Sequence, residues 1–406
     1  MKKCSSGGCQ LKTYGSTEKC ILHCEENKSD FYKIRFEFYE ALRKYLETKG
    51  SQDYFCLERF IFPRPDTQSS TNYLKLLHNR NLHFKDCIFL SNNLDIESAH
   101  CFFDNCTFNN YWSVHDVKVL ENTNGVLYQQ CEFNGSVNAY TSDRGSARLE
   151  SPLFNDCTFN DGIEFYNTTF ASSVFKNTNT ESLTIKSLKI ENCTFEEKFK
   201  LNKCLFESVL FKDSFFEKKV EFKNNTVQTL RVTNTNFKNL ADFYKSTFGD
   251  CFLFKSIFEG FVGFEKCKFG ECSASAGDKP STFKYVTFLN FLNFRSATFK
   301  TGLDIETVNL NEAPNFLNAT VEKRNSSRET FRIIKSSFDK INNYIEANKY
   351  FALEMSKYRE ELKGKPLTQE KLVFFLNEKF SNFGQSYLRP LLWMLCTSMF
   401  HLFVVK

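Results

Sequence analysis

The feature that most constrains this chain is an aromatic residue at about every fifth position through most of its length. Between Cys193 and Phe216 the recurring residues are Phe195, Phe199, Phe206, Phe211 and Phe216. A period of five fits neither an α-helix, with about 3.6 residues per turn, nor a flat strand, whose side chains alternate. It fits a chain that turns a corner after each five residues.

A small side chain stands two positions before most of these aromatic residues. Such a pair begins at Cys87, Cys106, Cys131, Cys157, Thr168, Cys193, Cys204, Ser214, Ser246, Ser256, Cys267, Val286 and Ala297. Because side chains alternate along a strand, both members of a pair point to the same side, the interior. A narrow tube has room for one large side chain on each face, which explains why the other is small.

Four five-residue faces make a square coil of about 20 residues, and such a coil cannot close its own core, so coils must stack. The sequence therefore predicts an all-β solenoid over residues 82–320, with about eleven coils before loops are subtracted. Two interruptions within residues 110–153 and a turn at residues 273–280 are expected to leave the core as loops on one edge.

These paired positions resemble the pentapeptide-repeat proteins, in the variety whose repeats are centred on phenylalanine. The resemblance covers residues 83–319. It implies a right-handed quadrilateral parallel β-helix. Some members of that family bind topoisomerases by mimicking the charge of duplex DNA, and another subset joins the β-helix to a membrane domain that resembles an ion channel.

The chain contains 16 cysteines, a number that would suggest disulfides in a secreted protein. Seven of them occupy the small inward position, where free cysteine acts as a small buried apolar residue. No basic segment followed by an apolar one opens the chain, so nothing indicates export. We expect a reducing cytoplasm around the solenoid.

The N-terminal residues 1–28 are predicted to form a zinc knuckle. Cys4, Cys9, Cys20 and His23 have the spacing C-x4-C-x10-C-x2-H, and zinc in structural sites takes four nitrogen or sulfur ligands in a tetrahedron. Cys24 is the alternative fourth ligand, and a short tail that binds nothing specific is the alternative to the whole site. Several phenylalanine-rich pentapeptide-repeat proteins are similar in having a short cysteine knuckle before the β-helix. A closed set of four ligands implies a structural rather than a catalytic ion.

Residues 29–81 are predicted to form a capping helix and an extended segment that leads into the solenoid. Asp30 is the expected N-cap and Gly50 the expected stop, with apolar positions between them on one face. The helix is expected to cover the first coil, whose rings and strand edges would otherwise be exposed. Prolines at Pro63 and Pro65 fit the extended segment.

After residue 320 the five-residue rhythm stops and helical spacing begins. Residues 321–383 are predicted to hold three helices, over 328–341, over 345–362 and from Thr368 onward through Leu372, Phe375 and Phe380. We expect them to close the C-terminal end of the β-helix.

Residues 384–406 form a hydrophobic segment, nearly all apolar from Leu391 to Val405 but shorter than the roughly 20 residues that span a bilayer. It fits the start of a transmembrane helix, an interfacial anchor or a buried core helix. Residues 386–393 look similar to the start of the channel-like membrane part in longer relatives of the pentapeptide-repeat family, and we expect the chain to be cut short at that part. Lys379 and Arg389 favour a location on the cytoplasmic side of a bacterial inner membrane.

The predicted function is that of a non-catalytic membrane-tethered scaffold or interaction protein, with a protein partner along the solenoid faces. The resemblance to the channel-linked subset implies the soluble part of a channel-like protein as one form of this function. The chain lacks a phosphate-binding loop, a nucleophile elbow and the HExxH motif, so no enzyme is expected. The net charge of +5 argues against a DNA mimic, which remains the alternative as a topoisomerase-binding protein. It also gives no reason to expect a nucleic-acid partner. A homo-oligomer is left open.

Overall fold

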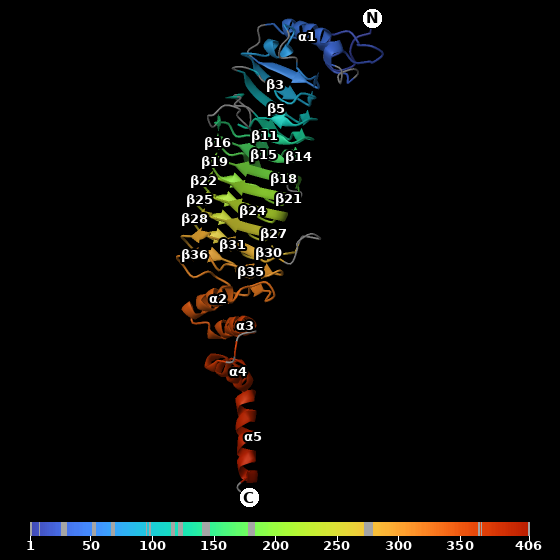
Figure 1. The fold of residues 1–406 in the computed structure, drawn as a ribbon. Coiled ribbons are helices and arrows are strands. Elements are labelled where there is room, and N and C mark those ends of the chain that lie inside the picture. Colours follow the sequence, from blue (N-terminus) through green and yellow to red (C-terminus); the bar gives the residue numbers. More distant parts are fainter. Residues whose placement is uncertain are drawn as a thin grey trace.

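The computed structural model of this 406-residue chain describes residues 2–7, 9–25, 31–50, 54–65, 70–94, 96, 99–114, 118–120, 125–139, 147–177, 183–271, 279–363, 366 and 368–404. The molecule is elongated, with a helix at the N-terminal end, a parallel β-solenoid of about 10 turns in the middle and four helices at the other end (Figure 1). The predicted β-solenoid is confirmed, with slightly fewer turns than the eleven expected from chain length.

Five parallel sheets make the solenoid wall. The first holds β1 (Phe55–Glu58), β3 (Asn81–Lys85), β5 (His100–Asp104), β8 (Lys118–Val119), β9 (Tyr128–Gln129), β13 (Phe154–Asn155) and β17 (Phe175–Asn177). The second holds β2 (Ile61–Phe62), β4 (Ile88–Phe89), β6 (Thr107–Phe108), β10 (Glu132–Phe133) and β14 (Thr158–Phe159).

The third sheet is the longest. It holds β7 (Trp112–Ser113), β11 (Val137–Ala139), β15 (Ile163–Tyr166), β18 (Leu183–Glu191), β21 (Cys204–Lys212), β24 (Thr226–Thr233), β27 (Thr247–Phe254), β30 (Lys268–Phe269), β31 (Ser281–Lys284), β34 (Thr298–Phe299), β35 (Leu303–Asp304) and β37 (Thr320–Val321). The fourth holds β12 (Ala147–Leu149), β16 (Thr168–Phe170), β19 (Thr194–Phe195), β22 (Phe215–Phe216), β25 (Asn236–Phe237), β28 (Ile257–Phe258), β32 (Thr287–Phe288) and β36 (Asn309–Leu310). The fifth holds β20 (Phe199–Lys200), β23 (Val220–Glu221), β26 (Ala241–Asp242), β29 (Val262–Gly263) and β33 (Leu292–Asn293).

The register between coils shows where the repeat is regular. In the middle of the rod, equivalent residues of neighbouring coils lie 21 positions apart, as with the Cys193 amide that donates to Ser214 Oγ. Farther along, Phe252 pairs with Thr282, so this coil is longer. It contains the turn predicted at 273–280, most of which lies outside the described residues. The two interruptions predicted within 110–153 correspond to the segments between β7 and β9 and between β11 and β12, where residues 115–117, 121–124 and 140–146 are likewise outside.

The core consists of aromatic rings stacked along the rod axis. One stack runs through Phe170, Phe195, Phe216, Phe237, Phe258 and Phe288, with ring centroids 4.5–5.1 Å apart and planes within 11° of parallel. This separation matches the spacing of hydrogen-bonded strands, about 4.8 Å, because each ring belongs to the next coil. The rings predicted to point inward are therefore the rings that fill the tube.

Helix α1 (Phe31–Thr48) covers the first coil as predicted. Its residues Ile34, Phe38 and Leu42 are fully buried, and the Phe38 ring lies 6.1 Å from that of Phe62 in β2. A short 3-10 helix, η1 (Tyr73–Leu76), packs beside it. The expected N-cap, Asp30, lies outside the described residues, whereas the expected stop, Gly50, has a positive φ of 70° two residues after the helix.

Four helices follow the last coil: α2 (Arg328–Lys340), α3 (Tyr344–Leu362), α4 (Gln369–Ser381) and α5 (Leu388–Val404). Phe331, Ile334 and Phe338 of α2 are buried against the end of the solenoid, so α2 closes it as expected. The third predicted helix is α4, with Thr368 as its N-cap, but the residues named for it face outward. In α4 the buried ring is Phe374, while Leu372, Phe375 and Phe380 are 42–50% exposed.

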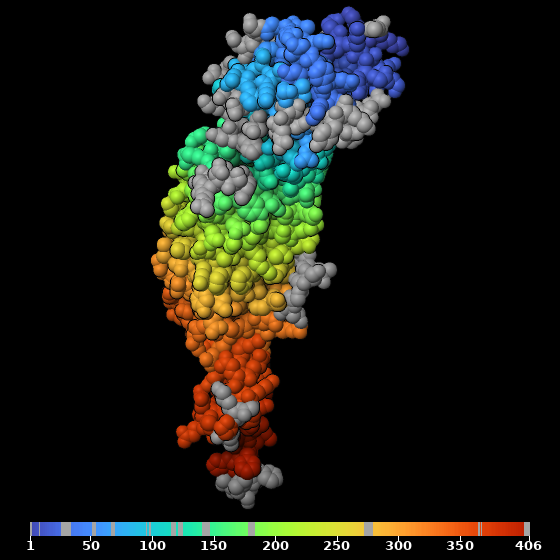
Figure 2. Space-filling model, turned by 45° about the horizontal axis from the view of Figure 1, so that its top comes forward, coloured from blue at the N-terminus to red at the C-terminus, as the bar shows by residue number. Residues whose placement is uncertain are grey.

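Helix α5 extends away from the rest of the molecule and forms its C-terminal tip (Figures 1 and 2). Within the part of the chain that the structure describes, no helix is at once long enough and apolar enough to cross a membrane.

Candidate functional site

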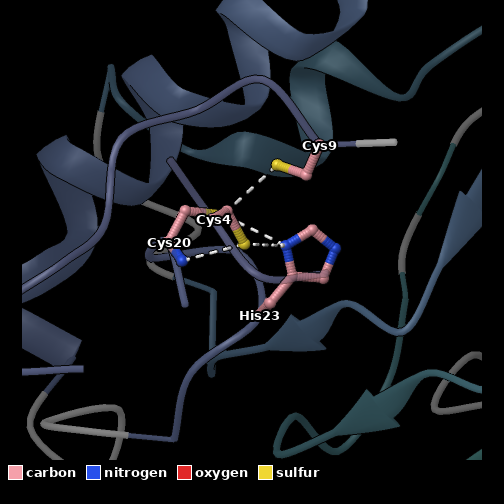
Figure 3. Close-up of side chains that lie close together, drawn as sticks. All are labelled: Cys4, Cys9, Cys20 and His23. Atoms are coloured by element: carbon pink, nitrogen blue, oxygen red, sulfur yellow. Dashed lines mark hydrogen bonds between the residues drawn. The ribbon is translucent and has the colours of Figure 1, made fainter. Parts of the chain in front are cut away.

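Three cysteines and one histidine come together in the N-terminal knuckle. One potential ligand atom from each of Cys4, Cys9, Cys20 and His23 lies within 4.8 Å of all the others (Figure 3). All four residues are buried, with exposed fractions between 1% and 8%. The four residues predicted as metal ligands are thus grouped as a site that could hold a metal ion.

Local backbone contacts explain why the four residues meet. A tight reversal brings the first two cysteines together: Lys3 and Lys12 form an antiparallel bridge, and the Cys9 amide donates to the Ser6 carbonyl at 3.1 Å. A turn holds the other two, because the His23 amide donates to the Cys20 carbonyl at 2.9 Å.

Backbone hydrogen bonding and buried apolar residues attach the knuckle to the solenoid. The Ile61 amide of β2 donates to the Leu22 carbonyl at 2.8 Å, and Leu22 itself is fully buried in the main core. The His23 ring also meets the Phe60 ring edge-on at 4.9 Å. The candidate metal site therefore lies where the knuckle joins the first coil.

Hydrogen bonds orient the ligand atoms. His23 Nε2 lies 3.3 Å from the Glu58 carbonyl oxygen, which can only accept, so Nε2 carries the proton and Nδ1 is left to bind an ion. His23 Nδ1 lies 3.1 Å from Cys20 Sγ and 3.6 Å from Cys4 Sγ. The Cys20 amide donates to Cys4 Sγ at 3.2 Å, which favours a thiolate there.

The environment separates the thiols by their acidity. Burial raises the pKa of Cys9 and raises that of Cys20 strongly. Burial also acts against ionisation of Cys4, but hydrogen bonds with the backbone of Cys20 and Ser6 outweigh it and lower the Cys4 pKa. A cation would be needed to hold all three sulfurs together as thiolates.

Cys24, the alternative ligand, is buried at 3% exposure but does not belong to the group of converging atoms. Its amide donates to the Cys20 carbonyl at 3.1 Å. The geometry therefore favours His23 over Cys24 as the fourth ligand.

The inward cysteines of the solenoid are of a different kind. Burial raises the pKa of Cys87, Cys106 and Cys131 well above the ordinary thiol value. Each of these thiols donates to a backbone carbonyl of a neighbouring coil, as Cys87 Sγ does to the Leu57 carbonyl at 3.0 Å. They are protonated packing groups with a hydrogen-bonding role at the corners.

A second candidate site is the exposed apolar surface of α5. Leu391, Trp393, Met394, Met399 and Phe400 are 45–71% exposed. No described residue of α5 is buried, so the helix is not a core helix of this chain.

Two groups of polar residues in the solenoid were not expected from the sequence. Glu221 of β23 is a buried carboxylate between lysines of neighbouring corners, 2.7 Å from Lys219 Nζ and 3.0 Å from Lys198 Nζ. His83 of β3 lies between Tyr54, whose hydroxyl is 2.6 Å from Nδ1, and Asp104, 3.6 Å from Nε2. Only the alternation of strand residues could have indicated either group, since Lys198, Tyr54 and Asp104 belong to other coils than the residues that they contact.

No protein-family model, no curated protein and no solved structure matches this chain.

Proposed function

We propose that this chain is a non-catalytic scaffold of the pentapeptide-repeat kind, held at the cytoplasmic face of a bacterial inner membrane, with protein partners along its faces. The observation that carries the proposal is a predominantly apolar, exposed helix, α5, at the tip of a rod-shaped solenoid (Figure 1). A helix with apolar residues on most of its sides is stable when apolar surroundings cover it. The resemblance to channel-linked relatives points to lipid as those surroundings.

The dimensions of one coil support a quadrilateral β-helix. Residues 204–224 complete one coil and bury four large rings, Phe206, Phe211, Phe216 and Phe222, each at most 2% exposed. Four inward rings per 21-residue repeat correspond to four faces of about five residues each. The right-handed sense of the coil follows from the general rule that connections between parallel strands of one sheet are right-handed.

The charge pattern of the outer surface favours a scaffold function over mimicry of DNA. A mimic needs rows of carboxylates, whereas the long third sheet carries pairs of opposite sign, such as Lys212 with Glu191 at 2.5 Å and Lys189 with Glu191 at 3.9 Å. Exposed apolar residues also lie on one column of the fourth sheet, where Phe215 and Ile257 flank Asn236. We propose that a protein partner binds this column.

The distances in the knuckle support zinc as the ion. Zn–S bonds of about 2.3 Å and Zn–N bonds of about 2.0–2.1 Å in a tetrahedron place two sulfurs about 3.8 Å apart and a sulfur about 3.6 Å from a nitrogen. Cys9 Sγ and Cys20 Sγ are 3.7 Å apart, and Cys4 Sγ and His23 Nδ1 are 3.6 Å apart, whereas Cys20 Sγ and His23 Nδ1 are closer, at 3.1 Å. Four protein ligands leave no open position, so the ion would be structural.

Tryptophan fluorescence of the full chain tests membrane attachment. The chain has two tryptophans, Trp112, which is 1% exposed inside the solenoid, and Trp393, which is 45% exposed on α5. Vesicles that contain brominated lipids should quench the emission of Trp393, and a Trp393→Phe variant should lose this quenching. The proposal is overturned if the chain neither sediments with vesicles nor shows quenching.

A gyrase supercoiling assay separates the scaffold from the DNA mimic. We expect no inhibition by the purified chain at concentrations equal to that of the enzyme. Stoichiometric inhibition would favour the topoisomerase-binding alternative.

A further inference from the structure

Helix α4 turns its apolar side away from the protein. Phe374 is its buried residue and packs in a small cluster with Leu362 and Phe383. The residues exposed by 40–64% are Leu372, Val373, Phe375, Leu376 and Phe380, hereafter the apolar arc. At about 100° per residue these five fall on one side of the helix, opposite Phe374. An ordinary surface helix buries such an arc.

The charged residues of this region are arranged unevenly around the arc. Both carboxylates of α4 are held by α3, since Glu378 pairs with Arg359 and Glu370 accepts from the Tyr358 hydroxyl. The exposed Lys379 projects from the same side of α4 as the arc, between Phe375 and Leu372, and its Nζ lies 5.6 Å from the Phe375 ring centre. Arg389, also exposed, donates to the Glu378 carbonyl at 3.2 Å. The arc is therefore bordered by positive charge.

The arc is continuous with the apolar surface of α5. The Phe380 ring of the arc lies 4.9 Å from the Trp393 ring of α5. Tryptophan is favoured at the boundary between headgroups and hydrocarbon, where basic side chains are also favoured. Figure 2 shows the two helices as the narrow end of the molecule, beyond the broad solenoid.

The occupant of this surface follows from its extent. A second copy of the chain would cover one stripe of each helix, but exposed apolar side chains are distributed around α5, interrupted by Arg389, Thr397, Ser398 and His401, and the arc of α4 adds a further face. A bilayer covers both at once, and anionic headgroups complement Lys379 and Arg389.

We propose that α4 lies in the headgroup–hydrocarbon boundary of an anionic bilayer, beside α5 and with its arc toward the lipid tails. This inference rests on the proposed function. The two helices then form one membrane-binding foot, and the surface recognised is anionic phospholipid.

A tryptophan placed in the arc reports directly on α4. In a Trp393→Phe background, the Phe375→Trp variant should be quenched by brominated lipids in vesicles of equal parts phosphatidylcholine and phosphatidylglycerol. The matched control is Phe215→Trp in the same background, because Phe215 is 47% exposed on the solenoid and Phe375 is 50% exposed on α4. The control should not be quenched.

Affinity measured by vesicle sedimentation gives a second readout. We expect Leu372→Glu with Leu376→Glu to weaken binding to these vesicles by about tenfold or more. Leu205→Glu with Ile257→Glu should change it by less than about threefold. The control pair introduces the same charge at solenoid residues that are both 41% exposed. Replacing phosphatidylglycerol by phosphatidylcholine should weaken binding by about thirtyfold, the value for two basic residues at an anionic surface.

The outcomes distinguish the two proposals. If native Trp393 is quenched while the tryptophan of the Phe375→Trp variant is not, the role of α4 is overturned and membrane attachment through α5 stands. Equal affinity for neutral and anionic vesicles overturns the proposal that the surface recognises anionic phospholipid. Absence of any vesicle binding overturns both proposals. A dimer in sedimentation velocity that is lost in Leu372→Glu with Leu376→Glu, without vesicle binding, would instead identify a second copy as the occupant.

Discussion

At the scale of single residues, the corners of the solenoid are made by a left-handed backbone conformation. The residue before a small inward side chain has a positive φ, as in Asn192 before Cys193 (53°) and Asp213 before Ser214 (49°). Asparagine and aspartate tolerate this region better than other residues with a side chain. Lys203 and Lys245 occupy equivalent corners with φ of 60° and 55°.

Lys203 allows the cost of this conformation to be measured, because its side chain is exposed. We expect Lys203→Gly to leave stability unchanged or to raise it by about 0.5–1 kcal/mol, since glycine adopts positive φ without strain. Lys203→Val should destabilise by about 1–2 kcal/mol, since a β-branched residue is strained there. Urea denaturation midpoints of the two variants measure the difference, and equal midpoints would contradict the prediction.

The buried carboxylate Glu221 makes stability depend on pH. Burial by itself raises its pKa, but ion pairs with Lys219 and Lys198 outweigh this and hold the pKa at about 2, below the ordinary value of 4.5. The folded state therefore binds this proton less readily than the unfolded state does. The stabilisation is complete above about pH 4.5 and is lost as the pH falls toward 2.

Glu221→Gln tests this dependence. We expect the variant to be less stable than the native chain by about 1–2 kcal/mol at neutral pH, with the difference disappearing between about pH 4.5 and 2. Denaturant titrations at several pH values measure it. A difference that is constant across this range would show that the ion pairs do not control the pH dependence.

At the scale of one element, each coil contributes rings to stacks that continue through its neighbours. The Phe237 ring in β25 lies 5.0 Å from that of Phe216 and 4.5 Å from that of Phe258. The adjacent outward residue of β22, Phe215, is 47% exposed. Phe215 and Phe237 thus differ in the side of the strand on which they lie: Phe215 points outward and Phe237 points into the core.

We expect Phe237→Ala to destabilise the protein by about 3–5 kcal/mol, because it opens a cavity between two coils. Phe215→Ala should change stability by less than about 1 kcal/mol. Thermal unfolding of both variants measures the contrast. Similar losses in the two would mean that the rings do not stack as described.

At the scale of the whole molecule, the two ends of the rod need covers, since a solenoid coil contacts only its neighbours. Helix α1 and the knuckle cover one end, and α2 covers the other. The knuckle is bonded to β2 through Ile61, so metal binding there should protect the first coil above all.

Removal of zinc from the metal-loaded protein with a chelator should therefore act locally. We expect amide exchange in β1 and β2 to accelerate by about tenfold or more, while β24 in the middle of the rod is unchanged. Exchange followed by mass spectrometry measures this. Uniform acceleration along the rod would contradict the local coupling.

The ligand set itself is tested by metal analysis. His23→Ala should lose the bound zinc and Cys24→Ala should retain it, as measured by the zinc content of the purified variants. The reverse result would assign the fourth ligand to Cys24.

Much of this structure could be predicted from the sequence because the constraint is local and repeated. Pairs such as Cys193 with Phe195 specify which side of each strand faces inward, and their number specifies a stacked tube. The grouping of Cys4, Cys9, Cys20 and His23 was also predictable, because their spacing along two short turns can bring them together without help from distant residues. The positive φ at each corner is only partly readable from the sequence. Asparagine or aspartate stands before many small inward residues, but lysine, tyrosine and serine also occupy that position.

The orientation of α4 and the partners of Glu221 could not be read from the chain. Helical spacing identifies an apolar arc, yet it does not state whether protein or another medium covers it, and Phe374 took the inward place. Glu221 pairs with Lys198, 23 residues before it in the chain, and with Lys219, two residues before it. Only the stacking of coils brings Lys198 close. The sequence by itself determined the repeating tube, because strand alternation and ring size act within five residues. Tertiary structure alone decided which surfaces stayed uncovered, because burial depends on what packs against a face and not on the residues that compose it.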